Sequence, residues 1–134
     1  MARKIANAPS TAEMEAMART ALDRLPGRFT AQMGEIVLLV EEWPDKALLE
    51  GFGIENPLGL TGVYEGLPLT ERSIEHSGTM PDRIRLFRRP ILDEWAERGN
   101  ETLEHLVAHV VIHEVGHHFG LSDEDMHALE DMAG

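Results

Sequence analysis

The segment from Glu101 to Phe119 constrains the fold more than any other part of the chain. Its apolar residues recur at intervals of three and four, the spacing of one face of an α-helix. They are Leu103, Leu106, Val107, Val110, Val111 and Val115. Asn100 can cap the start of this helix, and Gly120 can end it. We therefore predict a main helix over about Glu101 to Phe119, with this apolar face in the core.

Two elements are predicted in the first third of the chain. A helix should run from about Thr11 to Leu25, because Ser10 can cap it and Glu13 completes a capping box. The segment Glu35 to Glu42 contains the unbroken apolar run Ile36–Val40. A short, β-branched run of this kind is typical of a strand buried on both faces. We therefore expect a central strand there.

A glycine-rich stretch follows this strand and is expected to form a long loop. Its glycines are Gly51, Gly53, Gly59, Gly62 and Gly66. Within it, Leu60 to Tyr64 is predicted as a short strand, with a turn at Glu65-Gly66. Arg83 to Phe87 alternates between polar and apolar residues, which indicates a half-buried strand.

The second half of the chain is predicted to be mainly helical. Pro90 suits the first turn of a short helix that continues through Trp95 and is closed by Gly99. Beyond the main helix, Ser122 can cap a short C-terminal helix. The predicted order is α, β, β, β, α, α, α. This order indicates an α+β fold in which residues 1–134 form a single domain, without internal repeats or a domain linker.

The composition narrows the possible partners. Lys and Arg number 12 and Asp and Glu number 24, which gives a formal net charge of −12. Such a chain repels phosphate backbones, so nucleic acid is not an expected partner. The basic cluster Arg83, Arg85, Arg88 and Arg89 is better explained by outward positions on a strand.

Two absences in the sequence guide the expected location and the type of metal site. The stretch Met1 to Pro9 has no apolar core of a signal peptide, and no run approaches the ~20 apolar residues of a membrane span. A soluble cytoplasmic protein without membrane contact is therefore expected. The chain has no cysteine. Any transition-metal site must therefore use His, Asp and Glu.

The main helix carries such a set of residues. His113 and His117 are four residues apart, so they lie on one face of the helix and can bind one ion. Glu114 is placed to reach a water molecule on the metal rather than the metal itself. Catalytic zinc sites usually have three protein ligands. Asp123, six residues after His117, is the predicted third ligand, with Asp125 and His127 as alternatives.

The string from His113 to Asp123 resembles the metzincin motif, with Asp123 in the place of the last histidine. More of the chain resembles a small bacterial family of zincin-like metallopeptidases, often called minimal zincins. The matching segments are the strand before Trp43-Pro44, the segment Gly59 to Tyr64, and His113 to Asp123. The resemblance implies that His113, His117 and Asp123 are ligands and that Glu114 is the general base. It also implies a helix packed on a small mixed sheet.

These observations predict a zinc-dependent metallopeptidase with one Zn²⁺ per chain and a peptide or protein substrate. Glu114 would assist the attack of water on the peptide bond. Other divalent metals fit the same nitrogen and oxygen ligands. Two alternatives are a metal-binding module without hydrolysis and a metal-dependent endoribonuclease, since one ribonuclease family has metal histidines at similar offsets. The oligomeric state is left open.

Other candidate residues are expected to have ordinary structural roles. His105 and His109 continue the spacing of four backwards along the helix. His109 could line the cleft or support a ligand, but a partly exposed polar position is the expected one. Tyr64 is expected to cover the sheet rather than to stabilise an oxyanion. Met126 and Met132 are expected in the core and not in a methionine turn below a metal.

Overall fold

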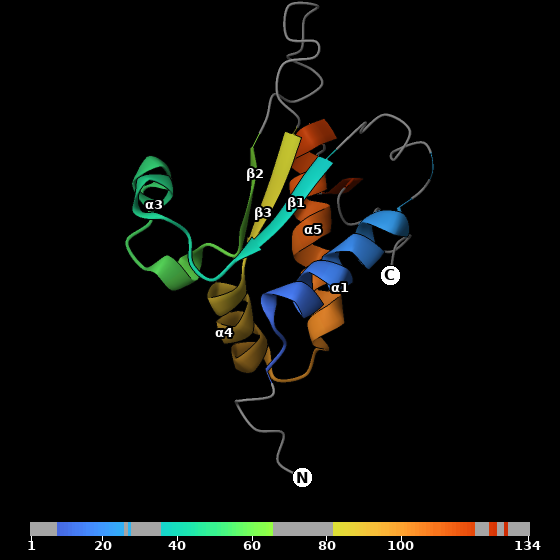
Figure 1. Ribbon diagram of the computed structural model, residues 1–134, viewed down its shortest axis with the longest axis horizontal. Helices are drawn as coiled ribbons and strands as arrows, with labels where there is room; N and C mark the ends of the chain where they lie inside the picture. Colours follow the sequence, from blue (N-terminus) through green and yellow to red (C-terminus); the bar gives the residue numbers. More distant parts are fainter. Residues whose placement is uncertain are drawn as a thin grey trace, which may run out of the picture.

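The computed structural model describes residues 8–25, 27, 36–65, 82–119, 124, 125 and 128. Within these residues, helices pack on a small three-stranded sheet (Figure 1). The elements, in chain order, are α1 (Thr11–Asp23), β1 (Ile36–Glu41), α3 (Lys46–Phe52), the short 3-10 helix η2 (Pro57–Gly59), β2 (Gly62–Glu65), β3 (Asp82–Phe87), α4 (Arg88–Arg98) and α5 (Leu103–Phe119). The predicted α+β fold is confirmed.

The sheet is mixed, with strand order β1-β3-β2. β3 pairs parallel with β1 and antiparallel with β2, so Ile84 lies between Leu38 and Tyr64. Figure 1 shows β3 between its two neighbours, with α5 beside the sheet. The mixed sheet that the resemblance implied is present.

The prediction that Glu35 to Glu42 forms the central strand was wrong. β1 pairs only with β3 among the described strands and forms an edge of the sheet. Ile36 and Leu38 are buried, but Val37, Leu39 and Val40 are partly exposed. The central strand is β3, whose alternating sequence had suggested a half-buried position. An apolar run shows that a strand is hydrophobic, but it does not show which strands lie beside it. The order of strands depends on pairing between segments that are far apart in the chain.

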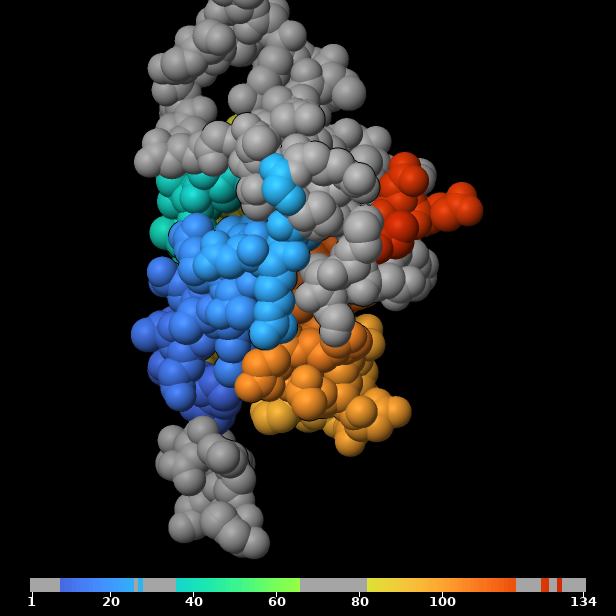
Figure 2. All heavy atoms as spheres, turned by 90° about the vertical axis from the view of Figure 1, so that its right-hand side faces the viewer, coloured from blue at the N-terminus to red at the C-terminus, as the bar shows by residue number. Residues whose placement is uncertain are grey.

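The core lies between one face of the sheet and the two helices α1 and α5. Ile36 and Leu38 of β1 and Ile84 and Leu86 of β3 point to this face and are buried. α1 contacts β1, whereas α5 contacts β2 and β3, and the two helices also contact each other. Figure 2 shows the surface of α1 in blue directly beside the orange start of α5. The described helices are not of the length and apolar character needed to cross a membrane.

Local sequence signals account for most helix ends. Ser10 and Glu13 form the predicted capping box, with reciprocal hydrogen bonds of 3.1 Å and 2.9 Å. Gly99 ends α4 in the left-handed conformation that glycine adopts readily. The start of α5 differs from the prediction: the Oγ1 atom of Thr102, and not Asn100, accepts a hydrogen bond from the His105 backbone N–H at 3.1 Å.

The glycine-rich stretch is not one long loop, as had been expected. It contains α3 and η2 before β2 begins at Gly62. The Asp45 side chain accepts a hydrogen bond from the Leu48 backbone N–H at 2.8 Å and so caps α3, and Gly53 ends that helix at φ 69°. β2 also includes Glu65, which had been assigned to a turn. Glycines inside and after the short helix α3 concealed its apolar spacing.

The face of the sheet opposite α1 and α5 carries an ionic network. Arg85, on the central strand, contacts Glu41 at 2.8 Å, Glu65 at 2.9 Å and Asp45 at 3.1 Å. Arg83 contacts Glu65 at 2.6 Å. These pairs join β3 to both neighbouring strands and to the start of α3.

The other two arginines of the basic cluster are also paired. Arg88 and Arg89, at the start of α4, both contact Glu42, at 3.0 Å and 3.1 Å. Arg83 and Arg85 lie at outward positions on a strand, as predicted, but the prediction was wrong for Arg88 and Arg89, because the strand ends at Phe87 and both residues belong to α4. The cluster is therefore balanced by neighbouring carboxylates.

Candidate metal centre

Four histidines of α5 form a stripe that is at least partly exposed to solvent: His105, His109, His113 and His117. The other described side chains near the C-terminal end of this helix are largely buried. Val110, Val111, Ile112 and Val115 are at most 5% exposed. His113 and His117 are exposed, with the side chain of His117 49% accessible. The helix is thus held firmly by its apolar residues, while its two motif histidines face outward on the same side.

The two motif histidines lie close enough to share one ion. Their ring centroids are 4.9 Å apart and the rings meet edge to face at 68°. His109 stacks on the other side of His113 at 6.5 Å. The predicted helical spacing of the pair is therefore confirmed, and His109 lies next to it as a neighbour.

Glu114 differs from the histidines because it points into the protein. It is only 6% exposed. This burial raises the pKa of Glu114 to about 7, against the smaller lowering effects of the His113 charge and of a hydrogen bond from the Tyr64 backbone. A carboxyl group with a pKa near neutrality can both take up and release a proton at physiological pH.

One oxygen of this carboxylate lacks a hydrogen-bond partner. Oε1 of Glu114 is buried and accepts no hydrogen bond from the described residues. The Nδ1 atom of His117 lies 3.0 Å away, but the two atoms do not have hydrogen-bond geometry. Buried polar atoms of this kind are uncommon and call for an explanation. A water molecule held beside the two histidines would satisfy Oε1.

The residues that are described fit a zinc ion in part. Two imidazoles on one helix face, with an unsatisfied carboxylate oxygen 3.0 Å from Nδ1 of His117, are suitable for a metal and its water. No group of three or more His, Asp or Glu residues able to hold a metal occurs within the described residues. The predicted third ligand, Asp123, and the alternative His127 lie outside them. Asp125 is described and exposed.

A cleft opens beside this pair. It has a volume of about 210 Å³, and α5 supplies one wall with His109, Val110, His113 and Glu114. Thr61, just before β2, and Glu94, from α4, complete it. The motif therefore lies at a hollow bounded by three separate segments of the chain.

Comparison with known protein families identifies the family to which the chain belongs. The model of a family described as zincin-like metallopeptidase matches residues 33–133. The chain belongs to this family. The match spans the sheet, the histidine helix and the position of Asp123, and membership implies a zinc cofactor in general terms. No curated protein matched the chain at a significant level.

Two cleft residues of this zincin-like protein were not singled out from the sequence. Thr61 and Glu94 precede His113 by 52 and 19 positions. Thr61 falls in the segment Gly59 to Tyr64 that carries the family resemblance, but nothing in the sequence marked either residue as part of a site. Tyr64 contributes in an unexpected way: its side chain packs against the core, as predicted, while its backbone holds Glu114. Only the packing of β2 and α4 on α5 brings these groups to the motif.

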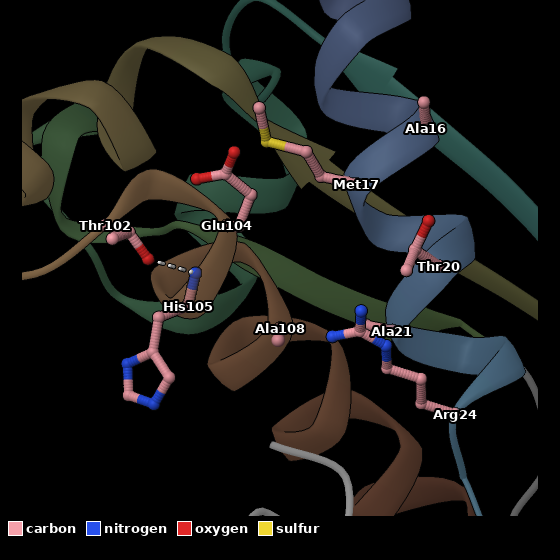
Figure 3. A pocket seen from close by; sticks show the side chains of 9 residues that line it. All are labelled: Ala16, Met17, Thr20, Ala21, Arg24, Thr102, Glu104, His105 and Ala108. Atoms are coloured by element: carbon pink, nitrogen blue, oxygen red, sulfur yellow. Dashed lines mark hydrogen bonds between the residues drawn. The ribbon is translucent and has the colours of Figure 1, made fainter.

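A larger hollow in the zincin-like domain lies away from the motif. It has a volume of about 450 Å³ between α1 and the first half of α5, and apolar side chains such as Met17 and Ala108 line it together with Arg24 and Glu104 (Figure 3). His105 reaches its rim but its ring points away from α1. The ring instead contacts Glu101. This hollow contains neither motif histidine.

Proposed function

We propose that this protein is a zinc-dependent peptidase that hydrolyses peptide bonds with Glu114 as the general base. The observation that carries the proposal is the buried Glu114 carboxylate, whose Oε1 atom has no hydrogen-bond partner among the described residues while two exposed histidines flank it. A structural glutamate would be expected to have its buried oxygens satisfied. A catalytic one keeps an oxygen free for the reacting water.

His113, His117 and Asp123 would hold the metal in this proposal. Their nitrogen and oxygen atoms form a donor set that suits Zn²⁺, and the first two already lie on one helix face. When bound, zinc supplies a Lewis acid that makes water more acidic and polarises a carbonyl group.

The protein's own residues would move the proton. Glu114 accepts one proton from the attacking water while the oxygen of that water forms a bond to the carbonyl carbon of the substrate. Glu114 then gives this proton to the nitrogen of the leaving amine as the carbon–nitrogen bond breaks. The direct products are one carboxylic acid and one amine, and transfer of the second water proton from the acid to the amine leaves a carboxylate and an ammonium group. In the protein without metal, burial already raises the pKa of Glu114 to about 7, so this carboxyl group can exchange a proton near neutral pH.

An extended peptide would bind along β2. Among the described strands β2 pairs only with β3, and it lies against α5 beside the cleft. Addition of a peptide to a sheet edge is a common mode of recognition, because the backbone hydrogen bonds do not depend on sequence. Thr61 and Gly62, at the start of this strand, would then lie next to the peptide.

The test combines metal content with hydrolysis. Protein purified without a histidine tag is loaded with zinc, and mass spectrometry of a digested peptide library detects cleavage. We expect about one zinc per chain and cleavage in the wild type. Glu114→Gln should retain the zinc and lose at least roughly a hundredfold in kcat, because general-base catalysis contributes on that order.

Three outcomes would count against the proposal in different ways. Full activity of Glu114→Gln would remove the general base. Zinc binding without cleavage of any peptide would favour a metal-binding module, and cleavage of RNA in place of peptides would favour a nuclease. The variant Asp123→Ala tests the third ligand: zinc content unchanged by this substitution would assign that position to another residue.

A further inference from the structure

We propose that Glu94 of α4 gives the site a preference for substrates with a cationic group beside the scissile bond. The group would be either the free α-amino terminus or the side chain of Lys or Arg. This inference rests on the proposed peptidase function and names its substrate class. Glu94 would be a specificity-determining residue and would take no part in the proton transfers.

Glu94 lies in the cleft beside the motif. It lines the same cleft as His113 and Glu114, but it comes from α4 on another wall. The cleft volume of about 210 Å³ lies below the ~300–1,000 Å³ of pockets that enclose drug-sized ligands. The cleft therefore suits a single substrate residue, whose polar end would meet Glu94 while its carbonyl lies near the motif.

The described lining of the cleft favours a cation. The described lining residues include two carboxylates, Glu94 and Glu114, and neither Lys nor Arg. Glu94 is paired with Arg98, yet both contacts fall on the same oxygen: Nε and Nη2 of Arg98 lie 2.8 Å and 2.7 Å from Oε2. Oε1 of Glu94 takes no part in them. Arg98 also contacts Glu101 at 2.9 Å, so its charge is divided between two carboxylates.

The degree of burial decides how strong the effect should be. The side chain of Glu94 is 33% exposed, so a charge contact there is less screened by water than on an open surface. A hydrogen bond between charged groups that is partly shielded from water discriminates by roughly tenfold or more. An anionic substrate residue would instead be repelled.

The test uses matched peptides and the zinc-loaded protein. A cleaved library peptide is resynthesised with Lys, norleucine or Glu at each position next to the cleavage site, with a free or an acetylated N-terminus. The measured quantity is kcat/KM. Three variants are compared with the wild type: Glu94→Gln, Arg98→Gln, and the control Glu97→Gln, which removes an exposed charge from the same helix outside the cleft.

We expect the Lys peptide, or the peptide with a free amino terminus, to exceed its neutral counterpart by about tenfold in the wild type. Glu94→Gln should abolish this preference, Glu97→Gln should keep it, and Arg98→Gln should increase it because Oε2 of Glu94 is released. Which of the two peptide series shows the effect identifies the cation. Equal rates for charged and neutral peptides, or a preference that survives in Glu94→Gln, would overturn the inference.

A second measurement separates this inference from the proposed function. The affinity of short model peptides with Lys, norleucine or Glu at one position, each with a free or an acetylated N-terminus, is measured for zinc-loaded Glu114→Gln protein, so that no cleaved peptide is required. A cation preference in binding that disappears when Glu94→Gln is added supports the role of Glu94 even if no peptide is cleaved. Equal affinities within both peptide series, Lys against norleucine and free against acetylated N-terminus, would overturn it. Thermal unfolding of each variant shows that the fold is retained.

Discussion

At the scale of single residues, the burial of Glu114 should make the metal-free protein less stable as pH rises. An ordinary glutamate, as in the unfolded chain, loses its proton near pH 4.5, whereas the folded protein holds this proton until about pH 7. Between these values the folded state binds more protons than the unfolded state, so the free energy of unfolding falls with rising pH and then levels off. The difference corresponds to about 3 kcal/mol.

The substitution Glu114→Gln should remove this loss. We expect the variant to exceed the wild type in free energy of unfolding by roughly 1–3 kcal/mol at pH 8, and the gain to disappear below about pH 4.5. Urea denaturation in the presence of a chelator measures both conditions. Glu97→Gln, an exposed control on α4, should change the stability by less than about 0.5 kcal/mol. A gain of the same size at both pH values would refute the linkage to Glu114.

At the scale of elements, the close approach of β2 to α5 positions the backbone that holds Glu114. The structure leaves no room for a side chain at Gly62, because an added Cβ atom would lie 2.9 Å from Cγ1 of Val110 and 3.1 Å from Cδ2 of Leu86. The Arg85 carbonyl oxygen, at 3.3 Å, belongs to the backbone of β3 and cannot rotate away. The glycine therefore allows the strand to lie directly against the helix.

The substitution Gly62→Ala should consequently cost about 1–3 kcal/mol in free energy of unfolding, the usual range for an overpacked core. It should also reduce peptidase activity, since β2 would move away from α5. Gly51→Ala is the matched control, because no atom lies within 4 Å of its added Cβ and alanine favours the helix α3 by about 0.5–1 kcal/mol. Chemical denaturation compares the two variants, and equal effects would show that space at Gly62 is not limiting.

Helix α1 lies outside the segment that matches the family model. α1 precedes residue 33, where that match begins, yet its residues Met14 and Ala18 are fully buried and it packs on both α5 and β1. The helix that carries the histidines is thus covered by an element outside the matched segment. The Ser10 capping box and the apolar stripe of α1 were sufficient to predict this helix from its sequence.

At the scale of the whole molecule, metal binding should couple directly to folding. A ligand that binds only the folded state stabilises it by about 2.7 kcal/mol when its free concentration is a hundred times the Kd. We expect zinc to raise the unfolding temperature of the wild type in this way, measured by calorimetry after dialysis against a chelator. His113→Ala should abolish the shift, while His105→Ala, at the other end of the histidine stripe, should leave it unchanged. A shift that persists in His113→Ala would place the metal elsewhere.

Within this molecule, the sequence by itself determined the features that depend on local spacing. The interval of four placed His113 and His117 on one helix face, and alternation identified the outward Arg83 and Arg85. These features follow from the helix and strand periods, which act over a few residues. The assignment of His113, His117 and Asp123 as ligands and of Glu114 as base also came from the sequence and stays a prediction for the metal analysis to test.

Only the tertiary structure decided which segments meet. Among the described strands, it placed β1 at the edge of the sheet and β3 at its centre, contrary to the expectation from the apolar run in β1. It buried Glu114 under the Tyr64 backbone and brought Thr61 and Glu94 to the cleft. These outcomes depend on strand pairing and helix packing between residues far apart in the chain. Burial and charge environment are properties of that packing, and no local pattern of residues encodes them.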